Sequence, residues 1–173
     1  MTHGLDLGTL LLRVALGVTM LAHGYNHAWG GGKLAGTARW FESIGIRPGR
    51  VHAFLATSTE LVVAPLLFLG LLTPLAAAGV LGVMLVALIS NHLKNGYFIF
   101  RPGEGYEYVL FITFAALALA ALGGGGWSID DRLFVHGVPG CRWLFGWHGL
   151  LVAAVAGGGG AGLLLATCWR PKR

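Results

Sequence analysis

Residues 51–72 read VHAFLATSTELVVAPLLFLGLL, an apolar run of membrane-spanning length that contains a single acid, Glu60. About 20 helical residues are needed to cross the hydrocarbon core of a bilayer. A carboxylate at that depth costs several kcal/mol unless it is paired or protonated, so an acid inside a membrane is a candidate functional residue. The stretch therefore predicts a transmembrane helix whose Glu60 side chain has a polar partner.

The composition of the whole chain agrees with a membrane protein. Hydrophobic residues make up 55% of the 173 residues and charged residues only 11%, whereas a soluble domain carries about 25% charged residues. We therefore expect a single all-α protein embedded in a lipid bilayer. The formal net charge of +5 is explained by cationic edges that face lipid head groups, and it does not indicate a nucleic-acid partner.

Five segments are long and apolar enough to be predicted as membrane-spanning helices. Thr73 and Pro74 mark the turn between the second and third, because proline is favoured in the first turn of a helix. The four glycines at residues 157–160 predict close contact between the last span and another helix. The predicted spans are Leu7–Trp29, Val51–Leu72, Leu75–Leu93, Tyr106–Leu122 and Gly149–Trp169.

The basic residues predict the orientation of these spans. Residues 30–50, residues 94–105 and the C-terminal tail share one side and contain nine lysines and arginines, whereas the other side contains two, Arg132 and Arg142. The positive-inside rule then places the C-terminus in the cytoplasm and the N-terminus outside a prokaryotic inner membrane. Cys141 and Cys168 lie on opposite faces in this topology, too far apart for a disulfide, which needs Cα atoms within about 7 Å.

The predicted depth of Glu60 suggests its partner. By the helical rise, Glu60 lies about 13 Å and His23 about 9 Å from the cytoplasmic ends of their helices, so we expect a Glu60–His23 pair. Pro65 leaves the carbonyl group of Leu61 without its helical partner beside Glu60; alternatively, it only kinks the helix for packing. Arg13 lies near the outer end of its helix, where we expect its side chain to reach the aqueous interface; alternatively, it reaches inward along the helix face that carries His23 and His27.

Further polar residues are predicted to gather in the same cytoplasmic half of the bundle. His23, Asn26 and His27 are spaced i, i+3 and i+4 and therefore share one helix face. Histidines this close to an interface are also compatible with simple contact with water. The predicted catalytic residues are Glu60, His23, His92 and Glu107, and the predicted cofactor-binding residues are Asn26, His27, Asn91, Tyr97 and Tyr106.

Several short motifs occur in an order that resembles the DoxX family of small bacterial and archaeal membrane proteins. The resemblance implies a four-helix membrane bundle over residues 7–132. The predicted outer loop at 133–148 and the helix with a basic tail at 149–173 are then an extension, about which the resemblance says nothing. The motifs are Arg13-Val-Ala-Leu-Gly17 before His23-Gly24, Gly32-Lys-Leu-Ala-Gly36, Gly70-Leu-Leu-Thr-Pro74 after Glu60, His92 before Gly96-Tyr-Phe98, Gly103-Glu-Gly-Tyr-Glu-Tyr108, and GGGWSID at 124–130.

The resemblance implies a link to redox chemistry, because some members are similar to the small subunit of thiosulfate:quinone oxidoreductase. A quinone takes up two protons on reduction, and a desolvated carboxyl group and imidazoles are titratable groups that can supply them. The chain has no cysteine cluster and no nucleotide-binding loop, so electrons would come from a partner redox subunit or from a small reductant such as thiosulfate. We therefore predict a quinone-linked membrane subunit of a redox complex.

Other functions remain open. His23 or His27 together with His92 would offer histidines from two helices, as a bis-histidine haem site requires, although haem is the less favoured cofactor. A non-catalytic anchor or assembly subunit would use the glycine face of the last span to bind a partner helix. A transporter is disfavoured because the five spans show no inverted repeat.

Overall fold

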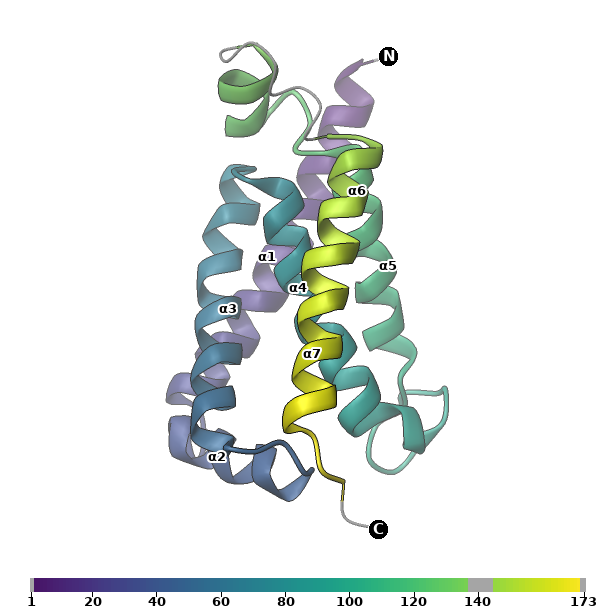
Figure 1. Ribbon diagram of the computed structural model, residues 1–173. Coiled ribbons are helices and arrows are strands. Elements are labelled where there is room, and N and C mark those ends of the chain that lie inside the picture. Colours follow the sequence, from purple (N-terminus) through teal and green to yellow (C-terminus); the bar gives the residue numbers. More distant parts are fainter. Residues whose placement is uncertain (1, 137–144, 172–173) are drawn as a thin grey trace.

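The structure, a computed structural model, describes residues 2–136 and 145–171, which fold as a helical bundle (Figure 1). Cys141 and Arg142 lie outside these residues. The α-helices are α1 (Thr2–Trp29), α2 (Lys33–Ser43), α3 (Gly49–Leu69), α4 (Thr73–Ala87), α5 (Glu107–Leu122), α6 (Trp147–Ala153) and α7 (Gly159–Cys168). Shorter helical turns are η1 (Leu88–His92) and η2 (Leu93–Asn95) after α4, η3 (Asp131–Val135), and η5 (Ala154–Gly158) between α6 and α7.

Within the described residues, four helical stretches are long and apolar enough to cross a membrane, which confirms the predicted all-α membrane bundle. They are His3–Trp29, Gly49–Leu69, Thr73–Asn95 and Trp147–Cys168. The remaining predicted span, Tyr106–Leu122, corresponds to α5, which has 16 residues. At the helical rise this is about 24 Å, somewhat less than the hydrocarbon thickness of about 30 Å. In Figure 1, α5 nevertheless runs beside α4 along the bundle, and the two helices are in extensive contact.

The predicted grouping of the loops at the two ends of the bundle is also observed. Residues 30–48, residues 94–106 and the C-terminus lie at one end, here called the basic end, and the N-terminus lies at the opposite end (Figure 1). The expectation of a plain loop at residues 30–50 is wrong, because residues 33–43 form α2. This helix is amphipathic, and it buries Ala38 and Phe41 against the bundle.

Helix α4 lies at the centre of the bundle and contacts α3, α5, α6, η5 and α7. Small side chains make this possible, because they let helix backbones approach closely within a membrane. Ala76 and Ala77 are completely buried. At Gly157 of η5 a side chain would collide with the carbonyl oxygen of Ala78, so only glycine fits where the last helix crosses α4. The predicted close contact of this glycine segment is therefore confirmed at Gly157.

The last helix is also fastened at the basic end. Arg47 donates its backbone N–H to the carbonyl oxygen of Cys168 at 2.9 Å, and Arg170 donates to that of Gly45 at 2.7 Å. The indole N–H of Trp169 donates to the carbonyl oxygen of Ile44 at 3.0 Å. These bonds join the end of α7 to the α2–α3 connection, so the additional helix forms part of the same bundle.

Arg13 is buried at the opposite end and does not reach the interface, so the prediction for this residue is wrong. Its side chain is 0% exposed. It donates hydrogen bonds to the carbonyl oxygens of Leu67 and Phe68, both at 3.3 Å, and to that of Trp127 at 2.7 Å. The last carbonyl groups of a helix have no intrahelical partner. The end of α3 therefore supplies the acceptors that a buried guanidinium requires.

Asp130 completes this arrangement, which we call the Arg13–Asp130 clamp. Its carboxylate accepts hydrogen bonds from the backbone nitrogens of Leu72 and Thr73, both at 2.7 Å, where α4 begins. Its charge also interacts with that of Arg13. Gly70 ends α3 with φ of +61°, and a side chain there would collide with the guanidinium of Arg13. The clamp thus fixes the turn between α3 and α4.

Candidate functional site

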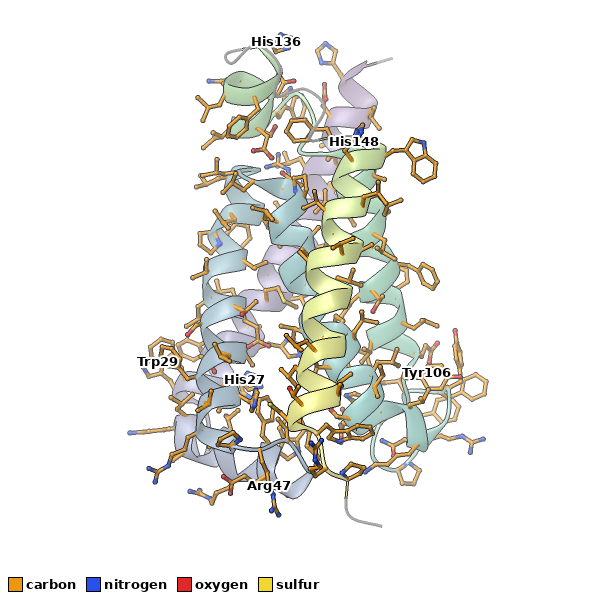
Figure 2. All side chains as sticks on the ribbon, viewed as in Figure 1. His27, Trp29, Arg47, Tyr106, His136 and His148 are labelled. Carbon is orange, nitrogen blue, oxygen red and sulfur yellow. The ribbon has the colours of Figure 1, made fainter. Side chains whose placement is uncertain are left out.

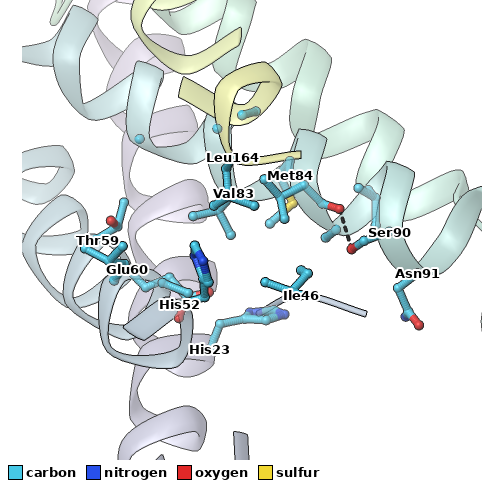
Figure 3. Close-up of a pocket in the computed structure, with 18 of the residues that line it drawn as sticks. His23, Ile46, His52, Thr59, Glu60, Val83, Met84, Ser90, Asn91 and Leu164 are labelled. Atoms are coloured by element: carbon cyan, nitrogen blue, oxygen red, sulfur yellow. Dashed lines mark hydrogen bonds between the residues drawn. The ribbon is translucent and has the colours of Figure 1, made fainter. Parts of the chain in front are cut away.

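A cavity of about 540 Å³ lies in the half of the bundle near the basic end (Figure 3). Residues from α1, α2, α3, α4, α5 and α7 contribute to its wall, which is mostly apolar. Its size falls within the range of small-molecule sites, about 300–1,000 Å³. Six residues with titratable carboxyl or imidazole groups line it: His23, His27, His52, Glu60, His92 and Glu104.

Glu60 is 1% exposed and pairs with His27, whose Nδ1 lies 2.8 Å from Glu60 Oε2. Gly24 allows this pairing, because a side chain there would lie 2.9 Å from Leu61 and 3.1 Å from the Cβ atom of Glu60. The glycine therefore lets α1 approach α3 closely at the level of the acid. This geometry agrees with the expectation that Glu60 faces the interior and has a polar partner.

The expected partner, His23, is incorrect. Side chains in a helix tilt toward its N-terminus, and the N-terminus of α3 is at the basic end whereas that of α1 is at the opposite end. The carboxyl group of Glu60 therefore lies one turn closer to the basic end than its backbone, whereas the ring of His27 points away from the basic end and meets it. His23 still lines the cavity, but its Nδ1 donates to the carbonyl oxygen of Thr19 at 2.8 Å.

His92 forms a second hydrogen-bonded pair in the cavity wall, with Tyr108. Its Nδ1 lies 3.0 Å from the carbonyl oxygen of Glu104, which can only accept, so Nδ1 carries a hydrogen. In the neutral ring Nε2 is then an acceptor, and the Tyr108 hydroxyl donates to it at 3.0 Å. The side-chain amide of Asn91 lies 3.3 Å from the same nitrogen. Asn91 also lines the cavity, as does Tyr108.

The structure does not bring the remaining predicted residues into this cavity. Tyr97 and Tyr106 contact each other edge to face, with ring centroids 5.5 Å apart, in the loop after α4. In Figure 2, Tyr106 and His27 lie on different sides of the basic end. Glu107 accepts a hydrogen bond from the backbone N–H of Ile99 at 3.2 Å and helps to hold the same loop.

Asn26 lines a smaller hollow of about 370 Å³ at the start of α2, together with the Gly30–Gly32 turn, Lys33 and Thr37. His27 lines both this hollow and the cavity. Its side chain is 19% exposed, whereas that of Glu60 is almost fully enclosed. His27 therefore lies between the surface of the basic end and the buried acid.

Comparisons with known proteins agree with the helical arrangement and with the motifs. The DoxX family model matches residues 8–93. A relative from Bacillus subtilis (strain 168), named "Putative oxidoreductase CatD", is 32% identical over 134 residues, which are 78% of this chain and 92% of that protein. The chain belongs to the DoxX family. No solved structure matches it.

The part of the chain that matches the DoxX family model contains five of these six titratable residues, all except Glu104. Tyr108 and the last helix lie beyond that match. In this DoxX protein Gly157, Gly160 and Ala161 nevertheless form part of the cavity wall. The additional helix therefore closes one side of a cavity whose polar residues come mostly from the matched region.

His52 is a cavity residue that the predictions omit. It is 7% exposed, and neither of its ring nitrogens has a hydrogen-bond partner within the described residues. A signal was available, since His52, Ala56 and Glu60 are spaced four residues apart and all three line the cavity.

Proposed function

We propose that this DoxX protein is a membrane component of a redox system and that its cavity binds the ring of a quinone. The observation that carries the proposal is the presence of two hydrogen-bonded pairs, Glu60–His27 and His92–Tyr108, in the wall of one apolar cavity. An apolar cavity with a few convergent polar groups suits a flat ring with oxygen substituents. The name of the Bacillus subtilis relative, which describes an oxidoreductase, supports a redox role.

The two pairs match the proton requirement of the reaction. Reduction of a quinone to a quinol consumes two electrons and two protons. Each pair joins a titratable group to a hydrogen-bonded neighbour, so each can deliver one proton to a quinone oxygen and be protonated again. The electrons come from a small reductant such as thiosulfate or from a partner redox subunit. The chain itself supplies the binding site and the protons.

The proposed proton route enters through His27. A histidine in contact with both the smaller hollow and Glu60 can accept a proton on one side and pass it to the acid on the other. His92 and Glu107, two of the predicted catalytic residues, are not the entry point of this route. Glu107 does not line the cavity, and Nδ1 of His92 is bonded to a backbone carbonyl group.

Glu60→Gln tests the proposal, because the amide keeps the shape of the side chain but carries no titratable proton. We expect the variant to fold normally and to bind decylubiquinone in equilibrium dialysis. Quinone reduction by membranes that contain the assembled system should fall about 100-fold, within the range ascribed to general acid catalysis. The loss should persist across pH, since glutamine cannot donate a proton at any pH.

Glu42→Gln is the matched control, because Glu42 is exposed and does not line the cavity. It should leave quinone reduction unchanged. Full turnover of the Glu60→Gln variant, with normal assembly, would show that the cluster is structural. Failure of the wild-type protein to bind the quinone would refute the binding site itself.

A non-catalytic anchor or assembly subunit is the second candidate. One face of the last helix supports it, since added side chains at Gly159, Gly160 and Gly162 would meet no heavy atom within 4 Å. Such a face lets a partner helix approach closely. Gly159→Leu with Gly162→Leu should then abolish copurification of a membrane partner, while the Glu60→Gln variant should retain both partner and turnover.

A further inference from the structure

His52 has an unusual environment for a buried imidazole. It lies on α3, three residues from the start of the helix, and its side chain is more than nine-tenths buried. Both ring nitrogens lack hydrogen-bond partners within the described residues, although the ring lines the cavity. A buried polar group without a partner costs free energy. An imidazole needs at least one partner, and here the cavity is the space from which that partner can come.

The other three imidazoles of the cavity are already engaged. His23 is bonded to a backbone carbonyl group, His27 to Glu60, and His92 to both a carbonyl group and a tyrosine hydroxyl. In the view of Figure 3, the ring of His52 lies between Glu60 and Ile46, among the other lining side chains. His52 is therefore the cavity imidazole with hydrogen-bonding capacity left for a ligand.

We infer that His52 binds one of the two oxygens of the ring ligand, an inference that rests on the proposed quinone site. His27 lies two residues from the end of α1 and His52 three residues from the start of α3, so both are in the helical turn nearest the basic end. The Glu60–His27 pair and His52 thus offer two separate polar contacts in the mostly apolar wall of the cavity, in addition to the His92–Tyr108 pair. A ring with an oxygen at each end, such as a 1,4-quinone or its quinol, satisfies both.

Because neutral imidazole has one donor and one acceptor nitrogen, His52 can serve both redox states of the ligand. Its N–H donates to the carbonyl oxygen of the quinone. Its other nitrogen accepts from the hydroxyl group of the quinol after rotation of the ring or exchange of the tautomer. His52 is accordingly a ligand-binding residue that orients the ring, and the protons still come from the two pairs described above.

Replacement of His52 by leucine tests this role in the full-length protein. Binding of decylubiquinone, measured by equilibrium dialysis in mild detergent, should weaken about tenfold, as expected for one lost hydrogen bond. Thermal stability without quinone should be unchanged or higher, because the leucine removes two unsatisfied polar atoms and breaks no bond within the protein. His52→Gln should restore part of the affinity, since its amide can donate.

An infrared measurement separates a direct contact from a change in cavity shape. With decylubiquinone labelled with ¹³C at one carbonyl at a time, one bound carbonyl stretch should lie at a lowered frequency in the wild type and return toward its unbound value in His52→Leu. Thr57→Val is the matched control. Thr57 is also buried on α3, and its hydroxyl has no hydrogen-bond partner in the described part of the chain, but it does not line the cavity. Thr57→Val should change neither the affinity for decylubiquinone nor the frequency of its bound carbonyl stretch.

The outcomes distinguish the inference from the function on which it rests. Tight quinone binding that is the same in wild type and His52→Leu overturns the role of His52, which then holds only water, and leaves the quinone proposal intact. No quinone binding by the wild type overturns both. Loss of affinity together with loss of thermal stability in His52→Leu, without rescue by glutamine, also overturns the inference, since it indicates a structural residue.

Discussion

Asp130→Asn is the substitution that most directly tests the Arg13–Asp130 clamp. The amide has nearly the same shape as the carboxylate, but one oxygen becomes an NH₂ group. In the wild type, both oxygens accept backbone N–H groups, from Leu72 and Thr73, at 2.7 Å. In the variant, one of these N–H groups faces another donor and has no acceptor.

The expected cost follows from these contacts. A buried N–H group left without an acceptor costs about 1–3 kcal/mol. Loss of a negative charge at the start of α4 costs a further 0.3–1 kcal/mol or so through the helix dipole. The buried guanidinium of Arg13 also loses the nearby charge, although it keeps its carbonyl acceptors. We therefore expect a loss of about 2–4 kcal/mol in the free energy of unfolding.

Unfolding in mixed micelles of dodecyl maltoside and increasing SDS, followed by circular dichroism, measures this free energy. Asp131→Asn is the neighbouring control, because the Asp131 side chain is 27% exposed and its oxygen lies 3.5 Å from His136. It should cost less than about 0.5 kcal/mol. If the free energies of unfolding of the two variants agreed within that margin, the clamp would not stabilise the α3–α4 turn and the reasoning would be refuted.

Two further predictions concern the last helix and the orientation of the bundle. Gly157→Ala should destabilise the protein relative to Gly159→Ala by about 1–3 kcal/mol. Both substitutions raise helix propensity equally, but only Gly157 abuts the Ala78 carbonyl group. Equal unfolding curves of the two variants in mixed micelles would contradict the close helix contact. In a cysteine-free background, Gly4→Cys should react with an impermeant maleimide in intact cells, and Gly31→Cys should react only after permeabilisation. The reason is that the basic end, where Gly31 lies, is predicted to be cytoplasmic. The reverse labelling pattern would invert the topology.

The helices and their grouping were predictable because they depend on long apolar runs and on the distribution of charge. Hydropathy gives the spans at residues 3–29, 49–69, 73–95 and 147–168 to within a few residues. It also requires an interior position and a partner for Glu60. Helix α2 was missed because its apolar residues are few and separated. Their role is visible only in the structure, where Ala38 and Phe41 pack on the bundle.

Partner identities were harder, because they depend on the direction of side chains and on long-range contacts. Depth alone favours His23 for Glu60, whereas the opposite polarity of the two helices brings His27 to it. Arg13 looks like an interfacial residue until the carbonyl group of Trp127, more than a hundred residues away, is found beside it. No local pattern contains that information, although the GGGWSID motif marks the segment that supplies it.

The two polar clusters of this membrane bundle differ in how their polar groups are satisfied, and therefore in their roles. Burial of a charge is costly unless hydrogen bonds and an opposite charge compensate it. At the Arg13–Asp130 clamp, that compensation comes mainly from backbone groups of α3, α4 and residues 127–130. These hydrogen bonds fix the turn between α3 and α4. Near the basic end, polar side chains pair with one another around about 540 Å³ of space, and the ring nitrogens of His52 have no hydrogen-bond partner among the described residues. A bundle that needed polar residues only for stability would have no use for the second arrangement, whose open hydrogen-bonding capacity is suited to a bound molecule.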